Sequence, residues 1–180
     1  MAYLLALLMS VQVFAKDRIP IGFSHEVETC ISKDKLWKQI ELAAIDSRGS
    51  WLWPQKSSHV RGNGLIEGEA LIVQYNLSIG EAEFGYEVAE VIEGQSFTYL
   101  AQPGNHPFEG GATVELERNG EGTKVLWTGR YYTDRTDFFR RQVFKNYAKK
   151  FFAELDENLE QAEMVECNQM GVAFFTERDA

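Results

Sequence analysis

Hydrophobic residues recur at two different spacings in different regions of the chain. One spacing predicts strands and the other predicts helices. From about residue 58 to residue 133, apolar residues alternate with polar ones in short runs that are separated by Gly- and Asn-containing turns. Successive side chains of a strand point to opposite faces, so each run has one apolar face and one solvated face. Six strands joined by short turns predict an antiparallel meander. The clearest runs contain Leu71, Val73, Tyr75, Phe84, Tyr86, Phe97 and Tyr99.

Helical spacing appears on both sides of this region. Before it, the pattern predicts a strand over 23–31, then Ser32 as N-cap of a short amphipathic helix over 33–44. After it, an aromatic stripe predicts a helix over about 134–163, with Thr133 and Asp134 as candidate caps. A helix of about 30 residues measures about 45 Å, so it must cross the whole sheet. Its basic residues precede its acidic ones, against the helix dipole, so packing of the stripe must stabilise it.

Residues 1–15 (MAYLLALLMSVQVFA) predict a signal peptide that is cleaved before Lys16, because the apolar run is too short to span a bilayer. No Lys or Arg precedes the run, which leaves a buried helix or a membrane-retained anchor as alternatives. Export would place the protein in the periplasm or outside the cell. We expect one domain over 16–163 and a tail over 164–180.

The composition argues against several classes of partner. A formal net charge of -9 disfavours nucleic acid, whose phosphates require clustered Lys and Arg. The two cysteines and the three histidines, His25, His59 and His106, show no metal-ligand spacing, so no metal or other cofactor is expected. A lone histidine in a loop, such as His106, is usually solvated. The sequence does not indicate an oligomeric state.

Three segments give the chain a family resemblance. They are Ser32–Trp37 (SKDKLW), Trp53-Pro54 and Gly122–Trp127 (GTKVLW). In their order and spacing, residues 23–163 resemble the START/Bet v 1-like (SRPBCC) superfamily, and most of all its polyketide cyclase/dehydrase and lipid-transport group. The resemblance implies an α+β helix-grip fold, in which a curved seven-stranded antiparallel sheet wraps around a long C-terminal helix, with one or two short helices after the first strand.

A lipocalin is the alternative fold, because Gly49-Ser50-Trp51 matches the Gly-x-Trp with which lipocalins begin. Lipocalins place eight strands between that Trp and their helix. Only about six strands fit here, and an amphipathic helix precedes the Trp. The pattern therefore favours the helix grip.

The resemblance also implies a small apolar ligand, lipid-like or polyketide-like, held between the sheet and the last helix. Alternation does not distinguish a cavity wall from packed core, and about half of any such list is expected to be core. The inner tyrosines are the sharper candidates, because each buried hydroxyl needs a partner. The candidate ligand-binding residues are Leu71, Val73, Tyr75, Phe84, Tyr86, Phe97, Tyr99, Trp127, Tyr131, Phe139, Val143 and Tyr147.

A second hypothesis is a cofactor-free cyclase or dehydratase that uses polar pocket residues. No nucleophile elbow, P-loop or dinucleotide-binding motif occurs, and no catalytic residue can be assigned. Arg61 and Arg130 could orient an anion if they point inward, although strand alternation puts Arg130 on the outer face. The basic half of the last helix could contact a membrane, but a solvated face is the simpler interpretation.

The helix-grip resemblance carries one further expectation, about Cys30 and Cys167. In that fold the first strand ends near the C-terminal end of the last helix. The two cysteines should therefore lie close enough to form a disulfide in an oxidising compartment.

Overall fold

The computed structural model describes residues 18–167, which form seven strands, two α-helices and one turn of 3-10 helix. The elements in chain order are β1 (Arg18–Thr29), α1 (Lys33–Ile45), η1 (Ser47–Gly49), β2 (Ser58–Gly62), β3 (Ala70–Leu77), β4 (Gly80–Ile92), β5 (Ser96–Ala101), β6 (Glu109–Asn119), β7 (Gly122–Asp134) and α2 (Phe138–Glu166).

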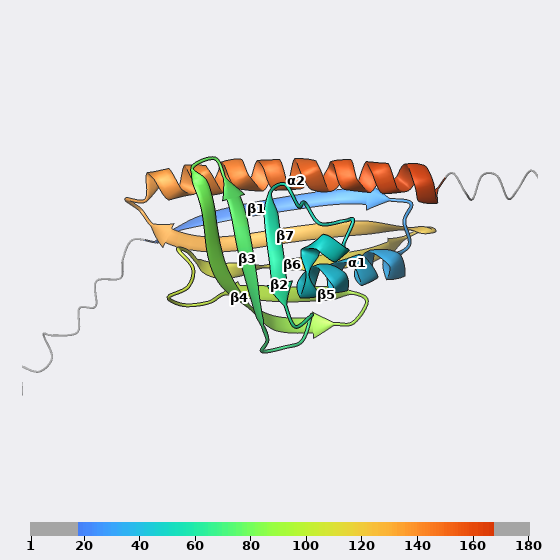
Figure 1. Cartoon of the computed structure of the whole chain (residues 1–180), viewed down its shortest axis with the longest axis horizontal. Helices are drawn as coiled ribbons and strands as arrows, with labels where there is room; N and C mark the ends of the chain where they lie inside the picture. The colour runs from blue at the N-terminus through green and yellow to red at the C-terminus, as the bar shows by residue number, and fades with distance from the viewer. Residues whose placement is uncertain (1–17, 168–180) are drawn as a thin grey trace, which may run out of the picture.

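The strands form one antiparallel sheet in the order β1-β7-β6-β5-β4-β3-β2. Consecutive strands from β2 to β7 are neighbours, so the expected meander is confirmed, and β1 joins it beside β7. The sheet curves strongly, so that β2, β3 and β4 run across the direction of β1 and β7 (Figure 1). The apolar residues that alternate along each strand face the concave side of this sheet, and the polar residues between them face the convex side.

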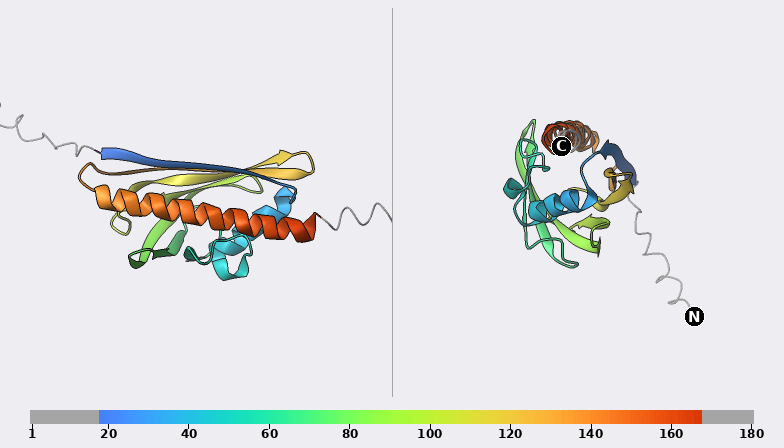
Figure 2. Two further views of the ribbon diagram at one scale, coloured as in Figure 1. Left: turned by 90° about the horizontal axis from the view of Figure 1, so that it is seen from above. Right: turned by 90° about the vertical axis from the view of Figure 1, so that its right-hand side faces the viewer.

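The two helices close the concave side of the sheet. Seen end-on, α2 lies across the open side between β1 and the β3–β4 region, and α1 lies within the curve at one end (Figure 2). Phe151, Leu155 and Leu159 of α2 are buried in a core cluster with Leu36 and Trp37 of α1. The aromatic stripe therefore holds α2 against the sheet, as expected from its unfavourable charge order.

The bounds of β1 and α2 differ from the sequence expectation. β1 begins at Arg18 and not at 23, because it pairs residue by residue with β7 up to Arg18 opposite Asp134. β7 consequently continues through Thr133 and Asp134, so neither caps the last helix. That helix begins at Phe138, with Asp137 as N-cap, and ends at Glu166, three residues beyond the expected 163.

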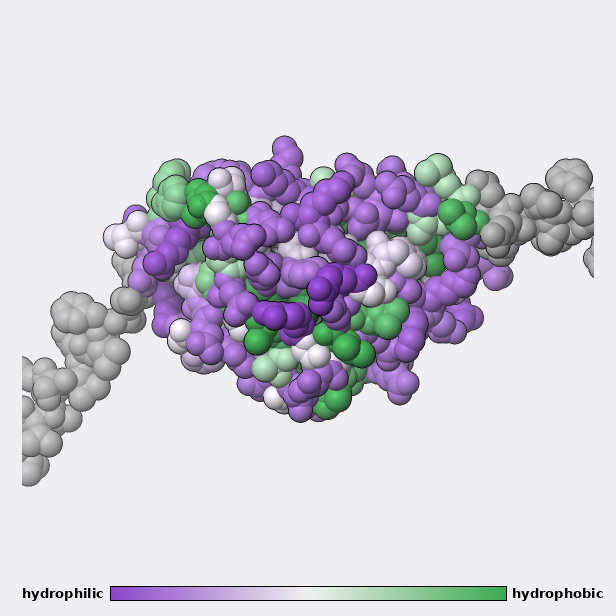
Figure 3. Space-filling view, viewed as in Figure 1, coloured by the Kyte–Doolittle hydropathy of each residue, from purple (hydrophilic) through white to green (hydrophobic). Residues whose placement is uncertain are grey.

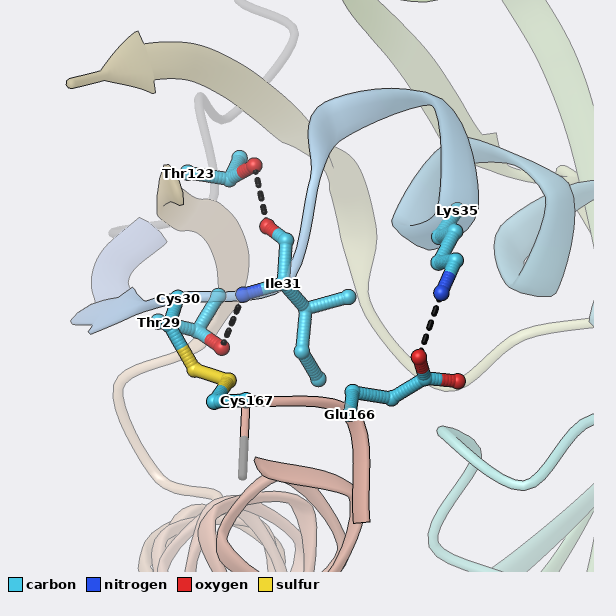
Figure 4. The surroundings of a disulfide bond; sticks show 7 residues. All are labelled: Thr29, Cys30, Ile31, Lys35, Thr123, Glu166 and Cys167. Atoms are coloured by element: carbon cyan, nitrogen blue, oxygen red, sulfur yellow. Dashed lines mark hydrogen bonds and ion pairs between the residues drawn. A yellow bond between two sulfur atoms is a disulfide. The ribbon is translucent and has the colours of Figure 1, made fainter. Parts of the chain in front are cut away.

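A disulfide joins Cys30, after β1, to Cys167, after α2 (Figure 4). Their Cα atoms are 6.3 Å apart, within the ordinary range for such a bond. Next to it, Lys35 of α1 forms an ion pair with Glu166 of α2. The Thr123 hydroxyl donates to the carbonyl oxygen of Ile31 at 2.7 Å. Strand, helix and sheet are thus tied together at one end of the molecule.

The expected signal peptide and most of the expected tail lie outside the described residues. Among residues 18–167, neither helix combines the length and the apolar character that crossing a membrane requires.

Candidate ligand-binding site

A cavity of about 70 Å³ lies between the sheet and the helices. Its walls come from the concave face of the sheet, from Ile40, Ala43 and Ala44 of α1, and from Tyr147, Ala148 and Phe151 of α2. The volume suffices for a few water molecules. The interior is therefore largely filled by its own side chains, and the hollow expected there is small.

A larger pocket of about 200 Å³ lies beside this cavity, toward the start of α2. The β3–β4 hairpin contributes Leu77 and Ile79, and α2 contributes Phe139 and Val143. The loop between β5 and β6 contributes His106, Pro107 and Phe108. The pocket is mostly apolar, and among the described residues that line it Arg140 alone carries a full charge near neutral pH.

Four aromatic side chains separate the two spaces. Tyr75, Tyr86, Phe144 and Tyr147 line both the inner cavity and the outer pocket. The rings of Tyr75 and Tyr147 pack edge to face, with 4.8 Å between their centroids. A ligand longer than the outer pocket would have to displace this partition.

A chain of hydrogen bonds runs through the partition. The hydroxyl of Tyr75 bonds that of Tyr86, and the Tyr86 hydroxyl lies 2.7 Å from Nε2 of His106. On the other side of the ring, Nδ1 of His106 faces the backbone of Phe108, with the carbonyl oxygen at 2.8 Å and the amide nitrogen at 3.1 Å. These groups form a relay from the backbone to the pocket wall.

The tautomer of His106 sets the direction of this relay. When Nδ1 donates to the Phe108 carbonyl, Nε2 accepts from Tyr86, Tyr86 accepts from Tyr75, and the Tyr75 oxygen retains a lone pair for a ligand donor. When Nδ1 accepts from the Phe108 amide, each bond reverses and the Tyr75 hydroxyl can donate to a ligand acceptor. The relay can therefore serve a hydroxyl or a carbonyl group.

Burial keeps the relay neutral. It lowers the pKa of His106 from 6.5 to about 4, partly offset by its bond to the Phe108 backbone. It raises the pKa of Tyr99 to about 12 and those of Tyr75 and Tyr86 further, because a phenolate would lose its hydration. A neutral His with a lowered pKa is a weak base, and these tyrosines are weak acids, so the arrangement suits hydrogen bonding more than proton transfer.

The one buried carboxylate among the described residues is that of Glu154 on α2. Its two oxygens accept from the backbone amide of Lys56 and the hydroxyl of Ser57, both at 2.8 Å. Because both oxygens are engaged, Glu154 attaches the loop before β2 to α2. It does not line either the cavity or the pocket.

All twelve residues expected at the site lie in the walls of these two spaces. Three of them, Phe84, Phe139 and Val143, line only the outer pocket, and Phe139 is largely exposed at its mouth. Those that line the inner cavity are Leu71, Val73, Tyr75, Tyr86, Phe97, Tyr99, Trp127, Tyr131 and Tyr147. Whether each of them contacts a ligand stays a prediction.

Several wall residues were not expected from the sequence. His106 is half-buried and bonded to Tyr86, so its interpretation as a solvated loop histidine was wrong. Its loop has no periodicity that could have indicated its direction. By contrast, Ala43 and Ala44 belong to the apolar face of α1, and helical spacing could have placed them near the site.

Other candidate polar residues lie elsewhere. Arg61 is exposed and bonds Glu83 at 3.1 Å, and Arg130 is also exposed, so neither points inward. His25 bonds Asp156 at 2.8 Å, and His59 bonds Ser47 at 3.1 Å. Within residues 18–167, no three His, Cys, Asp or Glu side chains group together as metal ligands.

Solved structures share this fold at low sequence identity. Protein NE0264 from Nitrosomonas europaea is 16% identical over 80% of this chain and 97% of its own, with a TM-score of 0.55. Protein SA2116 from Staphylococcus aureus is 10% identical over 81% of this chain and 97% of its own, with a TM-score of 0.59. Ara h 8.0201 is 15% identical over 82% of this chain and 100% of its own, with a TM-score of 0.55.

No family model matches the chain, and no curated protein matches it in sequence. Identities this low establish the fold alone. Seven antiparallel strands curved around a long C-terminal helix, shared with Ara h 8.0201, give this chain the Bet v 1-like helix-grip fold.

Proposed function

We propose that this chain binds a compact, uncharged, mostly apolar molecule that carries one oxygen substituent. The single observation that carries the proposal is the outer pocket, which is apolar but ends on the neutral relay of Tyr75, Tyr86 and His106. A volume of about 200 Å³ is suited to one or two fused rings or a short chain, since an apolar cavity of about 150 Å³ holds benzene. Most ligand pockets are larger, at about 300 Å³ or more.

The same features favour binding over the cyclase or dehydratase alternative. Burial weakens His106 as a base, and Glu154 is occupied by backbone and side-chain donors. We retain the polyketide cyclase/dehydrase and lipid-transport group as the proposed place of this chain within the superfamily, on the strength of the sequence resemblance. A carrier located in the periplasm or outside the cell is consistent with the apolar amino-terminal segment and with the Cys30–Cys167 disulfide.

The experiment compares 2-naphthol with naphthalene, which differ by one hydroxyl. Calorimetry should show the full chain binding both, with 2-naphthol the tighter. The Tyr75→Phe variant should weaken 2-naphthol binding about fivefold and leave naphthalene binding unchanged, because one hydrogen bond contributes about 1 kcal/mol.

Tyr132→Phe is the matched control, because Tyr132 lies on β7 outside both lining sets, and it should bind like the wild type. The proposal fails if neither compound binds. The role of the relay fails if Tyr75→Phe weakens both compounds equally.

A further inference from the structure

Large apolar side chains stand exposed around the mouth of the outer pocket. Phe138 and Phe139, at the start of α2, are 68% and 62% exposed, and Ile79, in the β3–β4 hairpin, is 62% exposed. Ile79 and Phe139 also line the pocket. In the space-filling view, apolar atoms gather where the hairpin meets the beginning of α2, within a largely hydrophilic surface (Figure 3). Such a cluster beside an open pocket indicates an interaction surface.

The first half of α2, on one side of this mouth, carries a charge opposite in sign to that of the whole chain, whereas the hairpin on the other side contributes Glu81 and Glu83. Residues 135–150 contain six Arg and Lys and one Asp, whereas residues 151–166 contain six Asp and Glu and no basic residue. The formal net charge of the protein is -9. Arg140, Lys145 and Lys149 are exposed on the same half of α2 as these aromatic residues. Basic side chains thus accompany Phe138 and Phe139 on the first half of α2, on a protein that is acidic as a whole.

We propose that this end of the molecule docks on an anionic phospholipid bilayer, with Phe138, Phe139 and Ile79 entering the headgroup region. Aromatic and aliphatic side chains flanked by Lys and Arg are the chemistry by which helices and loops bind the bilayer interface. Basic residues near an anionic surface each add attraction that salt screens. The charge complementarity argues for this occupant over an uncharged apolar partner.

The geometry of α2 makes the docking compatible with the overall acidity. The helix has 29 residues and is therefore about 43 Å long at 1.5 Å per residue. With α2 upright on the bilayer, its acidic half begins about 24 Å from Phe138, which is about two to three Debye lengths, so repulsion from that half is largely screened. In this orientation the outer pocket opens toward the lipid, and an apolar ligand could pass between them without crossing water.

The test is cosedimentation of the full chain with vesicles of phosphatidylcholine alone or mixed with phosphatidylglycerol. We expect binding to the mixed vesicles that weakens as salt is raised. The double substitution Phe138→Ser and Phe139→Ser should weaken this binding by about tenfold or more, because two aromatic rings no longer leave water. All variants share residues 1–17, so the difference between variants is the readout.

Matched control variants show whether vesicle binding depends on the pocket mouth or on exposed residues elsewhere. Ile66→Ser with Val165→Ser removes side chains that are 55% and 60% exposed elsewhere, and it should bind like the wild type. Lys145→Glu should weaken binding to the mixed vesicles, whereas Arg118→Glu, the same charge change at an exposed site on β6, should weaken it less.

The proposal is overturned if the wild type binds both kinds of vesicle equally, if it binds neither, or if the double serine variant binds like the wild type. Thermal unfolding shows whether each variant remains folded, because Phe139 lines the outer pocket and its substitution can itself change 2-naphthol affinity. Calorimetry of the wild type with 2-naphthol tests the pocket. Because that assay needs no lipid, failure of the docking and failure of ligand binding are distinguishable.

Discussion

His106 links the backbone of one loop to the wall of the outer pocket. Its ring contacts Phe84, Tyr86, Phe108 and Tyr131, none of which is charged near neutral pH. A protonated imidazole there would lack a compensating charge, which explains the lowered pKa. In the unfolded chain, the same side chain regains its ordinary pKa of 6.5.

Stability should therefore depend on pH through this residue. Below about 6.5 the unfolded state takes up a proton that the native state rejects until about pH 4, so the free energy of unfolding falls across that window. The loss attributable to His106 amounts to about 3 kcal/mol at most, at 1.36 kcal/mol per pKa unit. Denaturant titrations from pH 7 to pH 4 should show a shallower decline for His106→Gln. An unchanged slope in that variant would contradict the assignment.

The element that depends most on distant contacts is α2. Its charges oppose its own dipole, and its N-cap Asp137 makes no side-chain cap bond. Burial of Phe151, Leu155 and Leu159 holds its second half, and the disulfide attaches its C-terminal end to the end of β1. The helix thus forms one wall of both the cavity and the pocket, and its position depends mainly on contacts with other elements.

Removing the disulfide should consequently destabilise the whole domain. Cys30 and Cys167 are 137 positions apart, and closing a loop of that size contributes roughly 3–5 kcal/mol by restricting the unfolded chain. We expect Cys30→Ser with Cys167→Ser to lower the denaturant midpoint and to increase the slope, because the unfolded chain without the bond exposes more surface. Hydrogen exchange should show the last turns of α2 opening first. The wild type under reducing conditions should approach the variant; if its midpoint does not move, the bond contributes nothing.

At the scale of the whole molecule, the periodicity of hydrophobic residues predicted the order of strands and helices. It did not predict the volume of the space between the sheet and α2. Alternation placed residues such as Val73 and Tyr86 on the concave face, since the register of a strand determines its faces. Boundaries failed where pairing between distant segments decided them, as in the extension of β1 along β7 to Asp134. That volume depends on how closely the curved sheet and α2 pack, and hydrophobic patterns within single elements contain no information about this. His106 was misread for a related reason, because a loop has no period.

The division of the interior into two spaces leads to a prediction about where a ligand sits. Val143, on α2, lines only the outer pocket, and Ala44, on α1, lines only the inner cavity. A ligand held in the outer pocket should be excluded by Val143→Trp, with at least a tenfold loss of 2-naphthol affinity, and should tolerate Ala44→Leu. The reverse result would mean that the partition of Tyr75, Tyr86, Phe144 and Tyr147 opens and that the ligand lies inside. Thermal unfolding of both variants checks that the domain is intact, because overpacking usually costs about 1–3 kcal/mol. Calorimetry therefore locates the ligand in one space or the other, since each substitution fills a single space.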